Sequence, residues 1–181
     1  MSVRVRGTGW RAAYLFAALV LFLADQSSKA WAVRRLRTGE VVRAFDGVLH
    51  FAYAENPGIA FGRLQGGGEF GRWLLAALAG LAIVGLLLYL FRTKRTDDRI
   101  LGAIALLLAG VAGNLCDRIR LGHVIDFIEV YIGSYQWPTF NVADAAICTG
   151  AALLAIDLLL EGRREGRRQK AEGRPSAESG A

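Results

Sequence analysis

The sequence predicts an all-α integral membrane protein with four transmembrane helices and a small extracytoplasmic sheet in the first outer loop. Of the 181 residues, 54% are hydrophobic and only 21% are charged. A soluble domain of this length rarely reaches that balance without long apolar runs, and four such runs are present. A helix needs about 20 residues to cross the hydrocarbon core of a bilayer, and each run is close to that length.

The four expected spans are long apolar stretches that cover 12–32, 73–91, 100–116 and 142–160. Asp25 and Lys29 interrupt the first span, and Asp144 and Asp157 lie near the ends of the fourth. The arginines before the first span also resemble the start of a cleavable secretory signal, whose apolar core would end at a small-x-small site. Here the core runs into a polar segment, which favours a retained helix. We therefore expect one membrane-embedded domain over 1–160.

The outer loop, about 33–72, is the segment long enough to form structure outside the membrane. Residues 41–45 and 48–53 are rich in β-branched and aromatic side chains and flank a short turn, which predicts two strands. A small sheet lying on the membrane surface would follow. Beyond the last span, 161–181 is polar and rich in Gly and Arg. We expect it to be a disordered basic cytoplasmic tail that is attracted to anionic lipid.

The distribution of Lys and Arg sets the expected orientation of the spans. With the N-terminus inside, the inner segments carry 13 of these residues and the outer segments carry eight. Cytoplasmic loops of membrane proteins are enriched in Lys and Arg, so both termini are expected in the cytoplasm. Arg34, Arg35 and Arg37 depart from this rule, because they follow the first span on its outer side.

Polar residues gather at the outer ends of the expected spans and in the connection between the third and fourth spans. Even on a lenient scale, a charged side chain costs about 2.5–3.5 kcal/mol at the centre of a membrane helix, and less near the interface. A cluster contributed by three helices therefore predicts a polar chamber that opens to the outer surface. Its members are Asp25, Lys29, Asn114, Asp117, Arg118, Asp126, Asn141 and Asp144.

Some members of this chamber also have a purely structural explanation. Asp25 and Lys29 are spaced i, i+4, so they share a helix face and can neutralise each other. Asn114, Asp117 and Arg118 are spaced to satisfy one another at a helix end. Arg118 can equally hold a substrate carbonyl or a lipid headgroup, and the sequence leaves both roles open.

Asp126 and Asp144 are the strongest candidates for chemistry. They lie 18 residues apart, at the facing ends of two apolar segments. Paired carboxylates that share a proton can activate water for amide hydrolysis, which predicts a membrane-embedded aspartyl protease. Asn141 can instead act as a helix N-cap with Asp144 three residues later, whereas no capping role fits Asp126. A four-span transporter or assembly factor that uses the cluster as an ion path is the alternative.

Other kinds of site are not supported by the sequence. Cys116 and Cys148 lack CxxC spacing and fall in expected spans, so we interpret them as small buried thiols. His50 and His123 belong to different loops and form no zinc-protease motif. No GxSxG motif is present, and the glycines at 66–68 lack the pattern of a nucleotide site. We therefore expect no metal and no organic cofactor.

Five blocks of this sequence resemble those of the bacterial lipoprotein signal peptidase family, also called signal peptidase II. They follow the family's order and spacing, and the similarity extends over roughly residues 12 to 160. The blocks are Asp25-x-x-x-Lys29, Asn56–Phe61, Gly113–Arg118, Gly122–Phe127 and Phe140–Asp144. The Gly-x-Gly-Asp motif of other intramembrane aspartyl proteases is absent. The arginine-rich tail and the basic stretch after the first span are not part of the family pattern.

The resemblance implies a four-helix bundle in the bacterial cytoplasmic (inner) membrane, with a periplasmic β-cradle. It implies cleavage of the signal peptide immediately before the diacylglyceryl-modified cysteine of a prolipoprotein. The protein is expected to be a monomer that contacts membrane lipid and binds no nucleic acid. By block, the resemblance assigns the catalytic dyad to Asp126 and Asp144, and substrate contact to Asn56, Asn114, Arg118 and Asn141. It assigns support of the site to Asp25, Lys29, Gly58 and Asp117.

Overall fold

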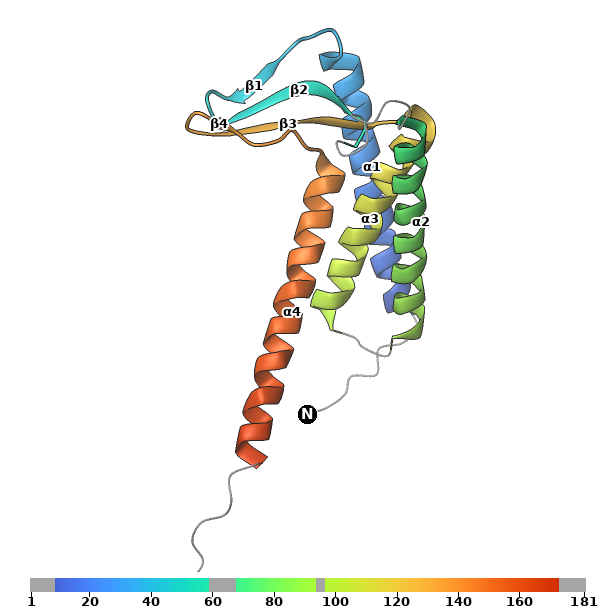
Figure 1. The fold of residues 1–181 in the computed structure, drawn as a ribbon, viewed down its shortest axis with the longest axis vertical. Coiled ribbons are helices and arrows are strands. Elements are labelled where there is room, and N and C mark those ends of the chain that lie inside the picture. The colour runs from blue at the N-terminus through green and yellow to red at the C-terminus, as the bar shows by residue number, and fades with distance from the viewer. Residues whose placement is uncertain (1–8, 59–67, 94–96, 173–181) are drawn as a thin grey trace, which may run out of the picture.

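The structure of the chain is a computed structural model that describes residues 9–58, 68–93 and 97–172, without the side chains of 163–172. Within these residues Figure 1 shows a bundle of four helices with a sheet lying across one end, which we term the sheet end. The helices are α1 (Trp10–Leu36), α2 (Gly68–Arg92), α3 (Asp98–Leu121) and α4 (Val142–Glu172). The strands are β1 (Val42–Phe45), β2 (Leu49–Asn56), β3 (Val124–Ile132) and β4 (Tyr135–Gln136).

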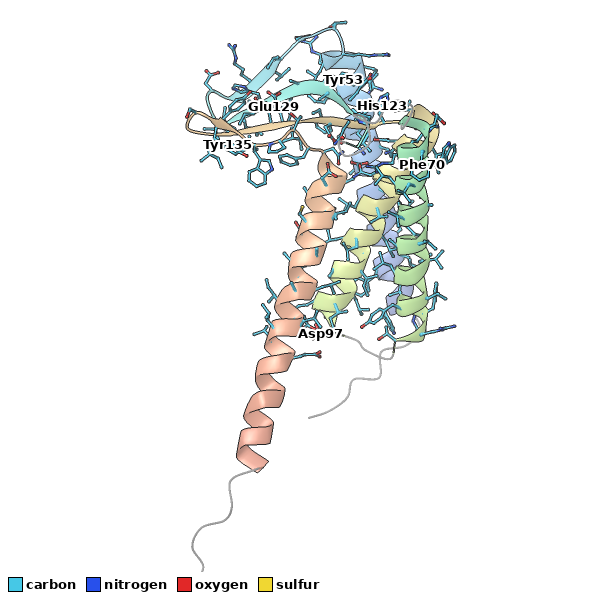
Figure 2. All side chains as sticks on the ribbon, in the orientation of Figure 1. Tyr53, Phe70, Asp97, His123, Glu129 and Tyr135 are labelled. Atoms are coloured by element: carbon cyan, nitrogen blue, oxygen red, sulfur yellow. The ribbon has the colours of Figure 1, made fainter. Side chains whose placement is uncertain are left out.

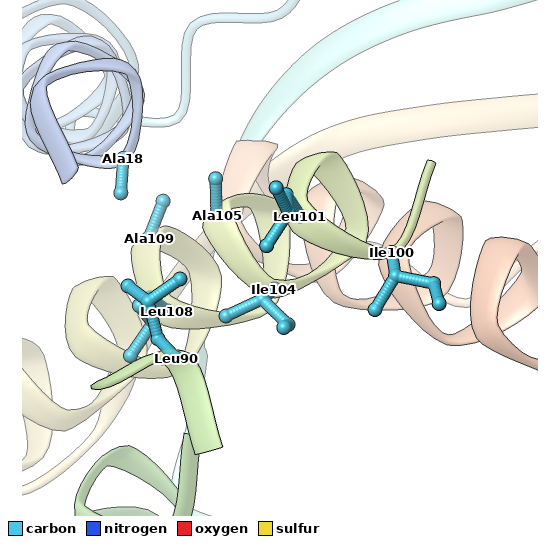
Figure 3. Packing of buried hydrophobic residues seen from close by; sticks show 8 residues of the cluster. All are labelled: Ala18, Leu90, Ile100, Leu101, Ile104, Ala105, Leu108 and Ala109. Carbon is cyan, nitrogen blue, oxygen red and sulfur yellow. The ribbon is translucent and has the colours of Figure 1, made fainter. Parts of the chain in front are cut away.

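The central helix of the bundle is α3. Three helices in the described part of the chain are long and apolar enough to cross a membrane, and they cover Glu69–Arg92, Asp98–Leu121 and Val142–Gly162. In α3, 61% of the most apolar window is buried, against 11% in α2 and 22% in α4. Thus α2 and α4 turn most of their apolar surface outward, as lipid-facing helices do. Figure 3 shows side chains of α3 lying between Ala18 of α1 and Leu90 of α2.

Glycines on α3 and α4 let these two helices approach closely. A Cβ atom added at Gly150 of α4 would lie 2.8 Å from the carbonyl oxygen of Ala103. One added at Gly110 of α3 would collide with the carbonyl oxygen of Ala143. In lipid, where apolar surface is already among apolar molecules, such close backbone packing is a main source of helix association. Because Ala143 precedes Asp144, the contact at Gly110 also sets the distance between α3 and the first turn of α4.

Helix α1 is long enough to span a membrane but carries polar side chains in the half nearest the sheet. It has 27 residues, and Asp25 and Lys29 are buried against α3. Arg34 and Arg35 lie in its last turn, where positive side chains interact favourably with the helix dipole. The helix therefore continues beyond the expected span 12–32 toward the sheet.

The sheet is antiparallel, with strand order β1-β2-β3-β4. The two strands expected from the sequence are confirmed as β1 and β2, and Ala54 of β2 pairs with Asp126 of β3. The sequence places the sheet in the first outer loop alone, and this is wrong, because β3 and β4 come from the connection between α3 and α4. Gly122 ends α3 with a φ of 87°, a left-handed conformation that favours glycine, and the chain then enters β3.

An apolar cluster attaches the sheet to α1. Leu36 of α1 packs in one buried group with Ile125 and Phe127 of β3. Trp31 of α1 meets Phe127 edge to face, with ring centroids 6.2 Å apart. The residues on both sides of Asp126 are thereby anchored to a helix, so this part of β3 has a fixed position relative to the bundle.

The C-terminal segment differs from its sequence-based expectation. The sequence predicts a disordered tail from residue 161, whereas α4 continues without a break to Glu172. Residues 161–172 are mostly Glu, Arg, Lys and Gln, which lose little side-chain freedom in a helix. The rest of the expected tail, 173–181, lies outside the described residues, as do 59–61 at the end of one sequence block and 66–67 of the glycine run.

Candidate active site

Asp126 and Asp144 lie at the sheet end of the bundle, one on β3 and the other in the first turn of α4. Asn141, which immediately precedes α4, connects them. Its side-chain Nδ2 donates to Asp126 Oδ1 at 2.7 Å, and its backbone N donates to Asp144 Oδ2 at 3.2 Å. Both carboxylates are therefore held by one fully buried asparagine.

The structural alternative for Asn141 and Asp144 is also realised. Asn141 Oδ1 accepts a hydrogen bond of 2.9 Å from the backbone N of Asp144, and Asp144 Oδ2 accepts one from the backbone N of Asn141. This reciprocal pattern is a capping box with aspartate in the usual glutamate position, and it satisfies two backbone donors at the start of α4. The cap occupies only Oδ2 of Asp144, so it is compatible with a chemical role for the carboxylate.

Asn114 of α3 links the same carboxylate to the centre of the bundle. Its Nδ2 donates to Asp144 Oδ1 at 2.7 Å. Its Oδ1 accepts from Asn141 Nδ2 at 3.2 Å and from Lys29 Nζ at 2.9 Å. Because both ends of the amide are engaged, its orientation is fixed, with the NH₂ group toward Asp144.

Asn56, at the end of β2, holds the second oxygen of Asp126. Its Nδ2 donates to Asp126 Oδ2 at 2.9 Å, while its Oδ1 accepts from the backbone N of Gly58 at 3.0 Å. Gly58 has a φ of 89°, and a Cβ atom there would lie 2.6 Å from Leu75 Cδ1. Glycine at this position therefore permits the turn that orients Asn56 toward the carboxylate.

Burial governs the charge of Asp126. The pKa of this carboxyl is raised from 3.8 to about 6, chiefly because burial penalises the charged form. Hydrogen bonds from Asn56 and Asn141 lower this pKa, whereas the negative charge of Asp144 raises it. Asp126 therefore keeps its proton to a higher pH than a carboxyl group in water. Neighbouring carboxyls that can share a proton are suited to general acid–base chemistry.

A buried ion cluster lies between α1 and α3. Lys29 Nζ is 3.0 Å from Asp25 Oδ2 and 2.8 Å from Asp117 Oδ2, and all three side chains are 2% exposed. Asp25 and Lys29 pair within α1 as their spacing predicts. Asp117, however, pairs with a different helix rather than with its own helix end. Breaking such a cluster is costly, because it leaves an uncompensated charge in the interior.

Arg118 lies one turn after Asn114 and is half-buried. Its Nη1 donates to the backbone oxygen of Asn114 at 3.3 Å. Its Nε is buried and has no hydrogen-bond partner within the part of the chain that the structure describes. A guanidinium donor without a protein partner is available to a carbonyl, ester or phosphate oxygen of a ligand.

Two residues of this region were not singled out by sequence reasoning. Gln26 Nε2 lies 3.2 Å from both Asp25 Oδ2 and Asp117 Oδ1, so it bridges the two carboxylates. Arg72 of α2 donates from Nε and Nη2 to two backbone oxygens in the last turn of α3, each at 2.8 Å. An amide inside an expected span is a signal that identifies Gln26, but nothing local distinguishes Arg72 from other basic loop residues.

The remaining candidates play no part in this arrangement. Both cysteines are free, and Cys148 is exposed, which corrects the interpretation that both are buried. His123 lies 3.6 Å from Glu55, and Figure 2 shows His123 near the sheet and far from Asp97 at the opposite end of the bundle. Among the described residues, no three His, Cys, Asp or Glu side chains are grouped to hold a metal ion.

Comparisons with known proteins decide the family. A family model described as "Signal peptidase (SPase) II" matches residues 17–160, which include every residue of this site. The chain belongs to the signal peptidase II family. Members of this family are aspartic-type proteases, which agrees with the pair of carboxylates found here.

Curated relatives match most of the chain. The lipoprotein signal peptidase of Syntrophus aciditrophicus (strain SB) is 41% identical over 147 residues, which cover 81% of this chain and 91% of that protein. The lipoprotein signal peptidase of Xanthomonas campestris pv. campestris (strain 8004) is 42% identical over 151 residues, which cover 83% of this chain and 89% of that protein.

Solved structures share the fold of this chain. A bacterial membrane enzyme determined by the in meso method at 1.9 Å resolution has a TM-score of 0.74 and 27% identity, covering 82% of this chain and 93% of that one. A second, at 2.3 Å resolution, has a TM-score of 0.70 and 23% identity, covering 93% and 95%. With three apolar helices of spanning length among the described residues, this chain is an integral membrane protein.

Proposed function

We propose that this chain is an intramembrane aspartic endopeptidase that removes the signal peptide from lipid-modified prolipoproteins, cutting immediately before the diacylglyceryl-modified cysteine. The family match and the relatives named lipoprotein signal peptidase support this activity. The observation that carries the proposal is the convergence of Asp126 and Asp144 on Asn141, within the segment that the family model covers.

In the proposed mechanism, Asp126 and Asp144 form the catalytic dyad and hold one water molecule between them. The ionised carboxylate takes a proton from the water molecule while the oxygen of that water attacks the scissile carbonyl carbon. The protonated carboxyl gives its proton to the carbonyl oxygen or to the leaving amine. The shared proton belongs to the pair, so neither residue has a fixed role at the outset. These steps require neither a metal nor an organic cofactor.

Four neighbouring side chains are proposed to align the substrate. Asn56, Asn114 and Asn141 orient the dyad through their hydrogen bonds and offer amide groups to the substrate backbone. Arg118 offers a buried Nε that has no partner in the described structure, which suits it to a substrate carbonyl. The diacylglyceryl chains lie in lipid between the helices. The residues that support the site are Asp25, Lys29, Gly58 and Asp117.

The proposed topology has four spans, α1 included, with both termini in the cytoplasm and the sheet at the outer face of the bacterial inner membrane. The excess of Lys and Arg in the inner segments supports this orientation. The first turn of α1 and the last turn of α4 both lie away from the sheet end in Figure 1, as an even number of spans requires. The proposed unit is a monomer, because one chain supplies the dyad and all the side chains that hold it.

Cleavage is expected to require the lipid on the substrate cysteine. The acyl chains hold the scissile bond at the depth of the dyad, and a misplacement of about 1 Å already costs about a hundredfold in rate. Purified protein should therefore show a kcat/KM at least about a hundredfold lower for a prolipoprotein without the diacylglyceryl group than for the same chain with it. Mass spectrometry of the released signal peptide provides the measurement.

The two substrates of this experiment differ only in the lipid and thus control for the peptide sequence. Equally fast processing of both would contradict the proposed specificity. Absence of cleavage of either substrate by folded protein would contradict the proposed activity itself.

The kcat/KM of the enzyme is expected to fall on the alkaline side as Asp126 loses its proton. Its pKa is about 6, so the pair passes from one proton to none as the pH rises through that value. Asn56→Leu removes a hydrogen bond that favours the carboxylate, so the pKa of Asp126 rises and the fall moves to higher pH. The measurement is the pH at which kcat/KM for the lipidated substrate falls to half its maximum. This pH does not depend on how much the overall rate of the variant is reduced.

Glu55→Gln, at the neighbouring residue of β2, is the matched control for this pH experiment. The Glu55 carboxylate accepts a hydrogen bond of 2.8 Å from the Tyr53 hydroxyl and lies near His123. Its neutralisation should therefore leave the pH of the alkaline fall unchanged. A fall that moves to lower pH in Asn56→Leu, or moves equally in both variants, would show that the Asn56 hydrogen bond does not set the charge of Asp126.

A further inference from the structure

We propose that Lys29 is a positioning residue that holds the two carboxylates of the dyad in place at once, although no hydrogen bond joins it to either in the described structure. The inference rests on the proposed function, because it concerns the geometry of that dyad. Three acceptors surround the Lys29 ammonium group, and each is also hydrogen-bonded close to the dyad. Two of them accept from the backbone N of the residue directly before one of the two aspartates. The third belongs to a side chain that donates to the carboxylate of Asp144.

The first connection runs from Lys29 through Asp25 to Asp144. Lys29 Nζ lies 3.0 Å from Asp25 Oδ2, and Asp25 Oδ1 accepts a hydrogen bond of 2.9 Å from the backbone N of Ala143. Ala143 directly precedes Asp144 in the first turn of α4. Its N–H is one of those that no carbonyl of its own helix can satisfy. Asp25 therefore ties the start of α4 to α1 immediately beside the dyad.

The second connection runs from Lys29 through Asp117 to Asp126. Lys29 Nζ lies 2.8 Å from Asp117 Oδ2, and this oxygen also accepts a hydrogen bond of 3.2 Å from the backbone N of Ile125. Ile125 directly precedes Asp126 on β3. Asp117 therefore ties the start of β3 to α3, again at the peptide before a dyad residue.

The third connection ends on the Asp144 carboxylate itself. Lys29 Nζ donates to Asn114 Oδ1 at 2.9 Å, and Asn114 Nδ2 donates to Asp144 Oδ1 at 2.7 Å. An ammonium group can only donate, so it fixes the amide with its oxygen toward Lys29 and its NH₂ group toward Asp144. Without this constraint the amide of Asn114 could turn over and withdraw its donor from the carboxylate.

The charge of Lys29 contributes as well as its position. The ammonium group has three N–H donors, and all three acceptors lie within 3.0 Å of Nζ. Without the cation, the buried carboxylates of Asp25 and Asp117 would repel each other and draw apart the two backbone N–H groups that they hold. The positive charge of Lys29 also lowers the pKa of Asp126, so its loss has an electrostatic signature at the dyad.

This arrangement does more than join helices. An ion cluster that only held α1 against α3 would need no bonds to other elements. Here the carboxylates of Asp25 and Asp117 accept hydrogen bonds from peptide N–H groups outside those two helices. Each of these N–H groups belongs to the residue directly before a dyad residue. One lysine thus couples the position of β3 to that of α4, the two elements that carry Asp126 and Asp144.

Lys29→Met tests the proposal, because methionine keeps much of the apolar stem while removing the ammonium group. In the folded fraction isolated by size exclusion, kcat for the lipidated prolipoprotein should fall at least about a hundredfold while KM changes little. The alkaline fall of kcat/KM should move to higher pH. A purely structural role would reduce the amount of folded protein and leave these two properties unchanged.

Two further variants complete the test. Lys29→Met/Asp25→Asn leaves one buried carboxylate in the cluster instead of two, which reduces the risk of misfolding, and it should show the same loss of kcat. Arg99→Met is the matched control, since it removes a cation paired with Asp97 and Asp157 at the opposite end of the bundle. It should retain the wild-type kcat.

Folded Lys29→Met with wild-type kcat and an unmoved pH profile would overturn the proposal. Failure of both Lys29 variants to fold would also overturn it, because the cluster would then serve the fold and not the dyad. Failure of the proposed function is a separate result. In that case the wild-type protein would leave the lipidated prolipoprotein uncut, or Asp126→Asn would cut it at the wild-type rate.

Discussion

Asp126→Asn and Asp144→Asn are each expected to lower kcat for the lipidated prolipoprotein by about 10³-fold or more. General acid–base catalysis contributes about 10²–10⁴-fold, and an amide can neither take a proton from water nor pass one to the leaving amine. Asparagine keeps an oxygen that can accept from Asn141, so each variant should still fold. Single-turnover cleavage by the purified variants, beside their melting curves, provides the measurement.

Asp157→Asn is the matched control for these substitutions. It makes the same change to another buried aspartate, which lies on the same helix as Asp144 but away from the sheet end. It should cleave the substrate at the wild-type rate. Full activity in folded Asp126→Asn or Asp144→Asn would remove that residue from the dyad, and a loss of activity in all three variants would point to a general effect of neutralising buried carboxylates.

The cores of the apolar helices are predictable from the sequence, but their ends are not. The expected span 100–116 is the middle of α3, which continues to Leu121. Polar residues that follow an apolar run resemble a loop when each is considered alone. In the structure Asp117 remains helical because Lys29, on another helix, neutralises it at 2.8 Å. The pattern of apolar and polar residues does not show that a helix continues past its apolar run when a tertiary contact stabilises the extension.

Strand β3 shows the limit of pattern-based prediction for the sheet. Its sequence is apolar on both faces, so it lacks the alternation that predicts a half-buried strand. Its first four residues are buried because one side meets α1 and the other meets the site. Gly122 is the local signal that α3 ends there. The pairing with β2 joins residues about 70 positions apart, which a single sequence does not show.

The two carboxylates of the site are predictable from the sequence, but the contacts that bring them together are not. The capping box of Asn141 and Asp144 follows from their spacing alone. The approach of Asp126 depends on its pairing with Ala54 across the sheet and on the close packing of α3 and α4 at Gly110. Local chemistry alone therefore leaves an ion path as an alternative, and the family resemblance favours the dyad.

Gly110→Ala is expected to lower kcat by about tenfold or more and to destabilise the fold by about 1–3 kcal/mol. The added Cβ would collide with the carbonyl oxygen of Ala143 and lie 2.7 Å from Ile147 Cγ1, so α4 must move away from α3. Such a movement displaces Asp144 from Asn114, its partner across the interface at 2.7 Å. Cleavage of the lipidated substrate and the melting temperature in detergent provide the measurements.

Gly102→Ala separates this steric effect from the effect of alanine itself. Gly102 lies on the same helix, and an added Cβ there meets no atom of the described residues within 4 Å. Alanine is up to about 1 kcal/mol more favourable than glycine inside a helix, so Gly102→Ala should be at least as stable as the wild type, with unchanged kcat. Gly110→Ala gains the same propensity, so the cost of separating the helices is its net loss of stability plus that gain. If both variants match the wild type, the position of Asp144 does not depend on the close approach of α3 and α4.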